Sequence, residues 1–300
     1  MIIKYLIYKE GHMSNKVKGI IFSFLSAFLY DLNVPISKYC LNNLSSNQLL
    51  FLLYFGASIG MVLVILFNKN RKSSFILDKK IRCQVLGVVL CDIFASLFIV
   101  ESLKYLSASV VSLLSVLEIG ATILISAVLF KKKISKKLLL SLISVTIGGM
   151  LLSIDSLFKD NVSLMVLFVV VATILWGAEN NLTASVSDKN SKALVFYKCL
   201  SVAIFNLIFI LDCNILSLVL NNWYLLLIGF FTYGLSILFF AYGTKFIGAG
   251  RTAIIFSLSP IFSMIISIIV FKSEINLLFI ISLIFMIIGI YLTASDKSED

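Results

Sequence analysis

The stretch SLMVLFVVVATILWGAENNLTA, Ser163–Ala184, is apolar for most of its length and becomes polar before it ends. A transmembrane helix needs roughly 20 mostly apolar residues, so this stretch is long enough to cross a bilayer. Glu179, Asn180 and Asn181 lie inside that length, where a charged side chain facing lipid costs about 3 kcal/mol or more. The sequence therefore predicts that these side chains face a polar cavity, with the rest of the chain forming its walls.

The composition indicates an integral membrane protein. The 300 residues are 60% hydrophobic and 13% charged, and the mean hydropathy is +1.07, which excludes an ordinary soluble domain. The net charge of +10 lies in short segments between apolar runs, so we expect lipid headgroups as neighbours and no nucleic acid. The five cysteines show no paired spacing and the only histidine is His12, so neither a metal site nor a cofactor is expected.

Hydropathy predicts an all-α membrane fold with short loops. Residues 1–16 and 295–300 form tails, and the MSNKVKG sequence that begins at Met13 leaves open whether residues 1–12 are a leader. The ten expected spans are 17–38, 47–67, 82–101, 107–130, 137–154, 162–184, 192–211, 221–243, 250–271 and 276–294.

The distribution of lysine and arginine predicts the orientation. If the N-terminus is inside, the inner segments hold 20 of these residues and the outer segments hold 4, and Lys198 alone falls within a span. Positive residues are enriched in cytoplasmic loops, so both termini are expected on the cytoplasmic side. We expect the inner membrane of a prokaryote as the location.

An internal repeat divides the chain into two units. Phe130–Leu151, FKKKISKKLLLSLISVTIGGML, aligns without gaps on Phe271–Leu292, FKSEINLLFIISLIFMIIGIYL, and 9 of 22 positions match. The expected domains are therefore 17–154 and 162–294, with five spans each. Because five is odd, the second unit must enter the membrane from the opposite side, and such inverted repeats typically enclose a midplane binding site.

Three motifs resemble a known family. LWGAENNLTASVS in the sixth span, ASVVSLLSVLEIGATILISAVLFKKKIS in the fourth and GRTAIIFSLSPIFSMIISIIVFKSEI in the ninth are similar to the drug/metabolite transporter superfamily, EamA-like branch. The resemblance covers residues 17–294. It implies ten transmembrane helices in two inverted five-helix repeats around a central cavity, usually for small polar or amphipathic metabolites. The glutamate that usually follows the ninth span is present as Glu274, whereas lysines stand at the equivalent place in the first repeat.

Glu118 lies near the middle of the fourth span. One interpretation is a structural carboxylate that is protonated or bonded to a neighbouring helix. The other is a proton carrier or a counter-charge for the substrate, because burial favours the neutral form of a carboxylate and makes its proton exchangeable.

Trp176, Glu179 and Asn180 share one helical face, because Glu179 follows Trp176 by three residues and Asn180 follows Trp176 by four. An aromatic ring beside a carboxylate suits a cationic or zwitterionic substrate. The alternative is that Asn180 and Asn181 only tie helices together. In the first repeat, the candidate binding residues at the approximately equivalent place are Tyr30, Asp31 and Asn33.

Further polar residues interrupt the spans. Lys198 either reaches the inner surface or turns inward to pair with Glu179 or Glu118, and Asp92 is expected to face the bundle interior. The candidate gating residues are Arg251, Pro35 and Pro260. Arg251 opens the ninth span, where it anchors the helix or gates the inner side, and the prolines free backbone carbonyls in the first and ninth spans.

These observations predict a secondary transporter and not an enzyme. No G-x-x-x-x-G-K-[ST] loop is present, so we expect coupling to protons or exchange of a counter-substrate. The expected cargo is a small polar, zwitterionic or cationic metabolite that resembles an amino acid. The expected partners are this substrate, a proton or counter-substrate and membrane lipids, and a homodimer is left open. The alternatives are a membrane enzyme acting on a lipid and a non-transporting binding or assembly protein.

Overall fold

The structure is a computed structural model, and its described residues form helices and turns with no strand among them. These residues are 14–30, 33–67, 75, 78–106, 111, 114–115, 117–129, 131, 134–157, 165–259, 261–262 and 277–296. Residues 1–12, Asp31, Pro260 and Glu274 lie outside this set, as does the side chain of Pro35.

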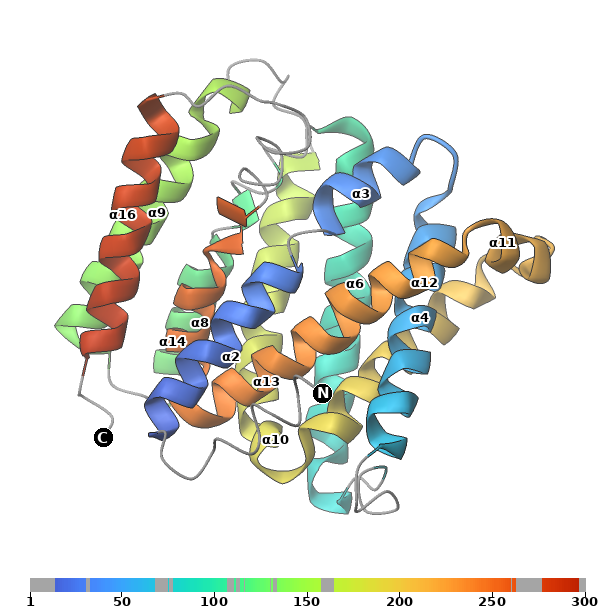
Figure 1. Cartoon of the computed structure of the whole chain (residues 1–300), viewed down its shortest axis with the longest axis horizontal. Helices are drawn as coiled ribbons and strands as arrows, with labels where there is room; N and C mark the ends of the chain where they lie inside the picture. The colour runs from blue at the N-terminus through green and yellow to red at the C-terminus, as the bar shows by residue number, and fades with distance from the viewer. Residues whose placement is uncertain are drawn as a thin grey trace.

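The helices form one bundle (Figure 1), and four of the described helical stretches are long and apolar enough to cross a membrane. A 3₁₀ turn, η2, precedes α6, and a π-helical segment, η3, joins α12 to α13. The elements are α2 (Asn15–Tyr30), α3 (Asn33–Cys40), α4 (Ser46–Leu66), η2 (Lys79–Ile81), α6 (Arg82–Tyr105), α8 (Leu117–Val128), α9 (Lys136–Leu157), α10 (Met165–Ile208), α11 (Ile215–Asn221), α12 (Trp223–Gly229), η3 (Phe230–Leu235), α13 (Ser236–Ile247), α14 (Ala249–Phe256) and α16 (Leu277–Ser295).

The second, third, fifth and tenth expected spans each coincide with one helix, namely α4, α6, α9 and α16. The first span is divided between α2 and α3, the eighth runs through α12, η3 and α13, and α10 contains both the sixth and the seventh. The backbone of α10 is broken at Asn190, where φ is −158° and ψ is 82°. The Asn190 side chain accepts a hydrogen bond from the backbone N–H of Ala193 at 3.1 Å. This is the bond that an N-cap residue makes, so Asn190 ends one arm of α10 and starts the next. The two arms therefore form a tight hairpin.

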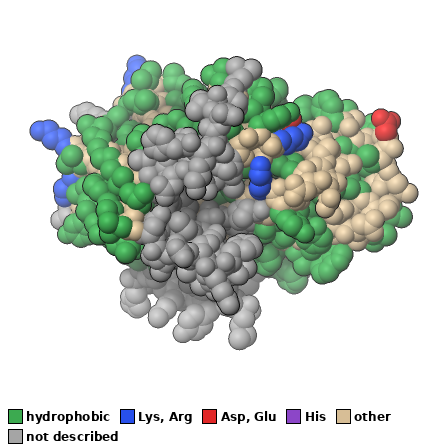
Figure 2. All heavy atoms as spheres, turned by 90° about the horizontal axis from the view of Figure 1, so that it is seen from above, with side chains coloured by type: hydrophobic (Ala, Val, Ile, Leu, Met, Phe, Trp, Pro, Cys, Tyr) green, Lys and Arg blue, Asp and Glu red, His purple; other side chains and the backbone are tan. Residues whose placement is uncertain are grey.

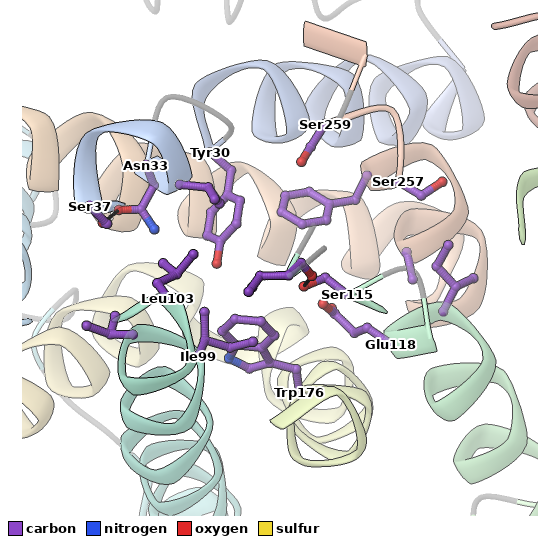
Figure 3. A pocket seen from close by; sticks show the side chains of 16 residues that line it. Tyr30, Asn33, Ser37, Ile99, Leu103, Ser115, Glu118, Trp176, Ser257 and Ser259 are labelled. Atoms are coloured by element: carbon purple, nitrogen blue, oxygen red, sulfur yellow. Dashed lines mark hydrogen bonds between the residues drawn. The ribbon is translucent and has the colours of Figure 1, made fainter. Parts of the chain in front are cut away.

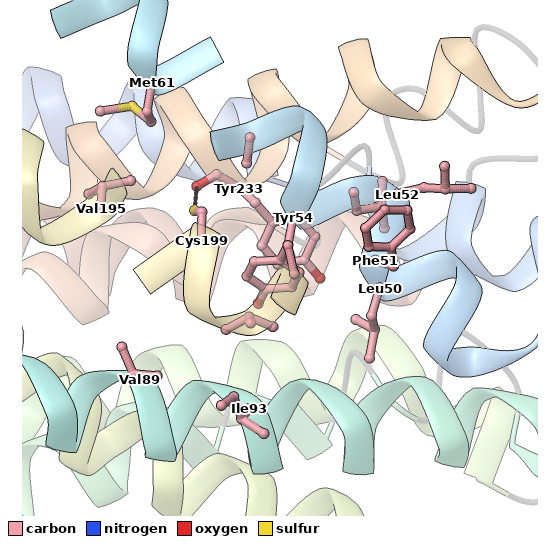
Figure 4. Packing of buried hydrophobic residues seen from close by; sticks show 14 of the residues in the cluster. Leu50, Phe51, Leu52, Tyr54, Met61, Val89, Ile93, Val195, Cys199 and Tyr233 are labelled. Atoms are coloured by element: carbon pink, nitrogen blue, oxygen red, sulfur yellow. Dashed lines mark hydrogen bonds between the residues drawn. The ribbon is translucent and has the colours of Figure 1, made fainter. Parts of the chain in front are cut away.

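The largest apolar core lies where α4, α6, α10 and α12 meet. Figure 4 shows Tyr54 and Tyr233 side by side in it, and their ring centroids are 4.3 Å apart. A Cβ atom at Gly56 would overlap the backbone of Leu226, so glycine is required for α4 and α12 to approach this closely. This packing fixes the position of η3, which carries Tyr233 toward the interior.

Helices α9 and α16 pack side by side at one end of the bundle (Figure 1) and run in opposite directions. The Ser144 hydroxyl donates to the carbonyl of Phe285, and the Ser141 hydroxyl donates to the carbonyl of Gly289. Residue numbers therefore rise along one helix as they fall along the other. These are the two helices whose sequences align as a repeat, so this seam joins the equivalent ends of the two units.

The same seam is reciprocal at aligned positions. A Cβ atom at Gly148 would lie 2.9 Å from both Met286 and the carbonyl oxygen of Ser282. At the aligned Gly289, a Cβ atom would meet Val145 and, at 3.1 Å, the carbonyl oxygen of Ser141. Each glycine thus faces the repeat equivalents of the residues that the other glycine faces.

Large apolar side chains cover much of the outside. Phe67, Leu124, Leu220 and Tyr291 are among the many exposed apolar residues. The face in Figure 2 is largely hydrophobic over its described part, with few charged side chains. An exposed apolar surface of this extent is unfavourable in water and suits contact with lipid chains.

Candidate substrate cavity

Two cavities lie inside the bundle and share part of their walls. The first is formed by the ends of α2, α3 and α6, by the residues before and within α8, and by α10 and α14, and its volume is about 60 Å³. The second, of about 50 Å³, lies among α2, α6, α10 and α13. The residues common to both walls are Tyr30, Glu118, Trp176 and Phe256. Figure 3 shows Tyr30, Glu118 and Trp176 turned toward the same space from three different segments of the chain.

A buried group of three charged residues lies on the wall of the second cavity. The Lys198 ammonium is 2.5 Å from Glu179 Oε1 and 3.2 Å from Asp92 Oδ2. Lys198 is 4% exposed, Glu179 5% and Asp92 1%, so water screens these charges little. The group joins both arms of α10 to α6. Removing charges from water is costly, and removing only one partner of such a group leaves a buried charge without compensation.

Glu118 has a different environment from the two acids that bind Lys198. Its Oε1 accepts a hydrogen bond of 2.7 Å from the Asn180 amide, and Asn180 also donates to the Thr122 hydroxyl at 3.1 Å. Glu118 is only partly buried and lines both cavities. Among the described side chains, no cation forms an ion pair with it. Glu118 is therefore the carboxylate that a molecule in either cavity can reach.

Aromatic rings surround this carboxylate. The Tyr30 ring centroid lies 5.1 Å from that of Phe256 and 5.9 Å from that of Tyr233. The Trp176 indole N–H donates to Asp92 Oδ1 at 3.3 Å, which ties the ring to the charged group. The Tyr233 hydroxyl accepts a 2.7 Å hydrogen bond from the Asn33 amide. The cavity wall is thus largely aromatic and apolar, with a few fixed polar groups.

A second charged network lies at another end of the bundle, where α2, α9, α14 and α16 meet. Arg251 Nη2 is 3.4 Å from Asp296 Oδ2, and both side chains are buried. Asp296 Oδ2 also accepts from the Ser135 hydroxyl at 2.7 Å, and its backbone carbonyl accepts from Lys16 at 2.7 Å. One aspartate therefore connects helices from both halves of the chain.

The sequence pattern of a transporter family matches nearly the whole chain. The EamA-like transporter family matches residues 17–154 and again residues 163–295, which is the two-repeat arrangement. The chain belongs to the EamA-like transporter family. It is therefore a membrane transporter of the drug/metabolite transporter type and a multi-pass membrane protein.

Solved structures agree with the fold of this EamA-like transporter. Matches were found to 28 chains. One is a crystal structure described only as that of a protein; it has a TM-score of 0.76 at 12% sequence identity and covers 91% of this chain and 94% of its own. At that identity the likeness concerns the fold alone. No curated protein matches the chain.

In this EamA-like transporter, the structure brings together most of the residues that the sequence predicts for substrate binding or proton coupling. Eight of them line at least one of the two cavities, and six of these are Trp176, Glu179, Asn180, Lys198, Asp92 and Glu118. Tyr30 and Asn33 also lie on the wall, Tyr30 in both cavities and Asn33 in the first. Lys198 turns inward and pairs with Glu179, one of the two partners predicted for it, and with Asp92.

Asn181 and Arg251 lie away from both cavities, and Asp31, Pro260 and the side chain of Pro35 lie outside the described part. The Asn181 amide donates to the backbone carbonyls of Thr122 and Gly177, both at 2.9 Å, and this asparagine lines neither cavity. Arg251 lies at the far network with Asp296. Asp31 is among the residues that the structure does not describe.

Sequence reasoning missed Phe256, Tyr233, Thr122 and Asp296. Phenylalanine and tyrosine are frequent in these spans, so nothing in the sequence distinguishes the two that reach the cavity. Asp296 follows the last span and looks like part of a solvated tail. Within the described residues, no group of three or more His, Cys, Asp or Glu side chains could hold a metal ion.

Proposed function

We propose that this EamA-like transporter moves a small zwitterionic or cationic metabolite across the cytoplasmic membrane of a prokaryote by alternating access. The supporting observation is the position of Glu118, a partly buried carboxylate on the shared wall of two internal cavities. A group in that position can exchange a proton or a bound cation with either cavity. Glu179 is the second candidate for coupling, through its contact with Lys198.

We further infer ten transmembrane helices in two oppositely inserted five-helix repeats, residues 17–154 and 162–294. The antiparallel, reciprocal packing of α9 against α16 supports this, because aligned helices that run in opposite directions are expected of an inverted repeat. The excess of lysine and arginine on one side supports cytoplasmic tails at residues 1–16 and 295–300.

The positions of the first cavity and of the Arg251–Asp296 contact indicate which side of the transporter is closed. The first cavity lies at the ends of α2 and α6, which the orientation places outside. The Arg251–Asp296 contact is then at the cytoplasmic end, where it joins helices of both repeats. We assign it the role of an inner gate that holds the described conformation closed toward the cytoplasm. Pro35 and Pro260 remain candidate gating residues, where freed backbone carbonyls line the cavity or a kink moves during access changes.

Counterflow in proteoliposomes tests the proposal. Vesicles containing the purified protein are loaded with one of a panel of amino acids and amines, and uptake of the labelled compound is followed. We expect uptake that an imposed proton gradient changes. In Glu118→Gln, the response to the gradient should be lost, because the amide can neither carry a proton nor pair with a cation.

Glu101→Gln is the matched control. Glu101 lies in the last turns of α6, where it lines neither cavity and is partly exposed and bonded to Ser46 and Lys104. It should leave both exchange and the gradient response unchanged. A gradient response that survives in Glu118→Gln would remove Glu118 from the coupling step, and an absence of counterflow across the panel would contradict the transport proposal.

A further inference from the structure

The segment of wall that both cavities share consists of one carboxylate and three aromatic rings. Its members are Glu118, Tyr30, Trp176 and Phe256. Aromatic faces carry negative potential and attract organic cations, most strongly where water is excluded. A carboxylate beside such faces adds an ion pair. The wall therefore has the composition of a site for an amine or another organic cation.

Hydrogen-bond donors on these walls are mostly engaged within the protein. The Ser115 and Ser257 hydroxyls donate to carbonyls of their own helical segments at 2.8 and 2.6 Å. The Asn33 amide donates to Tyr233, and the Asn180 amide donates to Glu118. The carboxylate of a bound molecule can only accept hydrogen bonds, and few donors on these walls are available to it.

Acceptors, in contrast, are in surplus. Glu179 Oε2 and Asp92 Oδ2 are buried oxygens without a hydrogen bond from any described residue, although Asp92 Oδ2 is within ion-pair distance of Lys198. Glu118 accepts a single hydrogen bond from the described side chains. An ammonium group has three donors and no acceptor, so it complements Glu118, the partly buried carboxylate on both cavity walls, and needs no donor from the wall.

The charges lead to the same conclusion. Three carboxylates, Asp92, Glu118 and Glu179, share the second cavity with Lys198, the only cation among its described wall residues. Lys198 is already bound to Asp92 and Glu179, so it is not available for the carboxylate of an amino acid. A bound cation or proton reduces the excess of negative charge, whereas a second carboxylate increases it.

We propose that the cavity selects organic amines that carry a positive charge and no carboxylate over the corresponding zwitterionic amino acids. This inference rests on the proposed function and chooses between the two substrate classes named there. Ile99, Leu103, Val111 and Ile119 add an apolar wall for the rest of the molecule. The ammonium lies against Glu118 and the aromatic rings, and the apolar part faces these aliphatic side chains.

Matched compounds test the selection. Phenethylamine, phenylalanine and 3-phenylpropionate share one skeleton and differ only in their charged groups, as do isoamylamine, leucine and 4-methylpentanoate. Each is titrated against the purified full-length protein in detergent, and the shift of Tm is followed. The amines should raise Tm with apparent affinities roughly tenfold or more above those of the amino acids, because an unpaired buried carboxylate is costly.

Two variants locate the site. Glu118→Gln should lose the response to the amines. Phe256→Leu keeps an apolar side chain but removes a ring, and should weaken amine binding roughly three- to tenfold. Glu101→Gln should bind the amines as the unsubstituted protein does. If Glu118→Gln does not fold, the effect of Phe256→Leu and the comparison of compounds still decide the question.

An amino acid or an acid that binds as well as its amine would overturn the selection, and so would the absence of a Tm shift with either amine. Counterflow of the same compounds separates this inference from the proposed function. Amine binding without counterflow supports the selection and contradicts transport. Counterflow of amino acids that exceeds that of amines supports transport and contradicts the selection.

Discussion

At the scale of single residues, the interior of this protein contains charged groups in two different situations. Lys198, Asp92 and Glu179 compensate one another at distances of 2.5 and 3.2 Å, whereas Glu118 relies on an amide. The first arrangement ties α6 and α10 together and makes Glu179 only the second candidate for coupling, whereas the second leaves the Glu118 carboxylate accessible. The difference explains why neighbouring acids in one cavity are assigned different roles.

The charged group of Lys198 gives a prediction about stability. Lys198→Met should destabilise the protein by about 3–5 kcal/mol, because it leaves two buried carboxylates without a cation. Thermal unfolding in detergent measures the loss. Combining it with Asp92→Asn should recover part of the stability, since the variant then has one buried charge fewer.

Lys104→Met is the matched control for this prediction. Lys104 pairs with Glu101 at 2.8 Å, but both side chains are about one-third exposed. Exposed pairs contribute about 0–1 kcal/mol, so this change should have a small effect. Equal losses in the two lysine variants would show that burial does not determine the contribution of Lys198.

The sequence predicts part of the cavity because helical spacing is visible in it. The separation of Trp176, Glu179 and Asn180 places them on one face, and polarity inside an apolar span indicates which face is turned inward. The partners of these residues come from distant helices, and spacing within one helix carries no information about them. Thr122 and Phe256 could not be found for that reason.

At the scale of elements, close helix contacts depend on glycine. The sequence GASIG in α4 contains Gly56 and Gly60, four residues apart, and both face the segment that begins with α12. A Cβ atom at Gly229 of α12 would in turn overlap the backbone of Leu53. Pairs of small residues with this spacing allow membrane helices to approach closely.

Gly56→Ala should therefore destabilise the protein, by about 1–3 kcal/mol, because α4 and α12 must separate to admit a methyl group. The matched control is Gly120→Ala in α8, where a Cβ atom would meet nothing within 4 Å. That change should be neutral or stabilising by about 0.5–1 kcal/mol, since alanine favours the helix. Thermal unfolding of both variants measures the difference, and similar losses would contradict the packing described here.

Hydropathy predicts where the helices lie and fails at their irregularities. The expected span 47–67 corresponds to α4, Ser46–Leu66. The π-helical segment η3 was not predicted, because a change from i→i+4 to i→i+5 hydrogen bonds leaves the apolar pattern unaltered. The break at Asn190 was expected only as a loop, and its capping geometry depends on a single side chain.

At the scale of the whole molecule, inverted insertion makes a prediction that needs no substrate. Asn43 and Lys189 are both exposed and lie 13 residues beyond Tyr30 and Trp176, the approximate repeat equivalents. In a background without the native cysteines, Asn43→Cys should react with an impermeant thiol reagent from outside and Lys189→Cys only from inside. Labelling of both from one side would show that the two repeats insert with the same polarity.

The inner gate gives a second prediction at this scale. Arg251→Gln or Asp296→Asn should open the cytoplasmic side, because each removes a charge from the buried contact. Opening is measured as the rate at which a cysteine at the buried Ser187 reacts with a thiol reagent from inside. Lys137→Gln, a change at an exposed contact in the same region, should leave that rate unchanged. Equal rates in all three variants would exclude the gate.

The hairpin of α10 bears on how the chain enters the membrane during synthesis. Glu179 and Lys198 lie on its two arms, 19 residues apart, so each charge meets its counter-ion within one continuous segment. Two spans that leave the insertion machinery together can neutralise each other before α6 contributes Asp92. We expect the two arms of α10 to enter the membrane together with Glu179 and Lys198 already paired. Lys198 is then not exposed to lipid chains without its counter-ion.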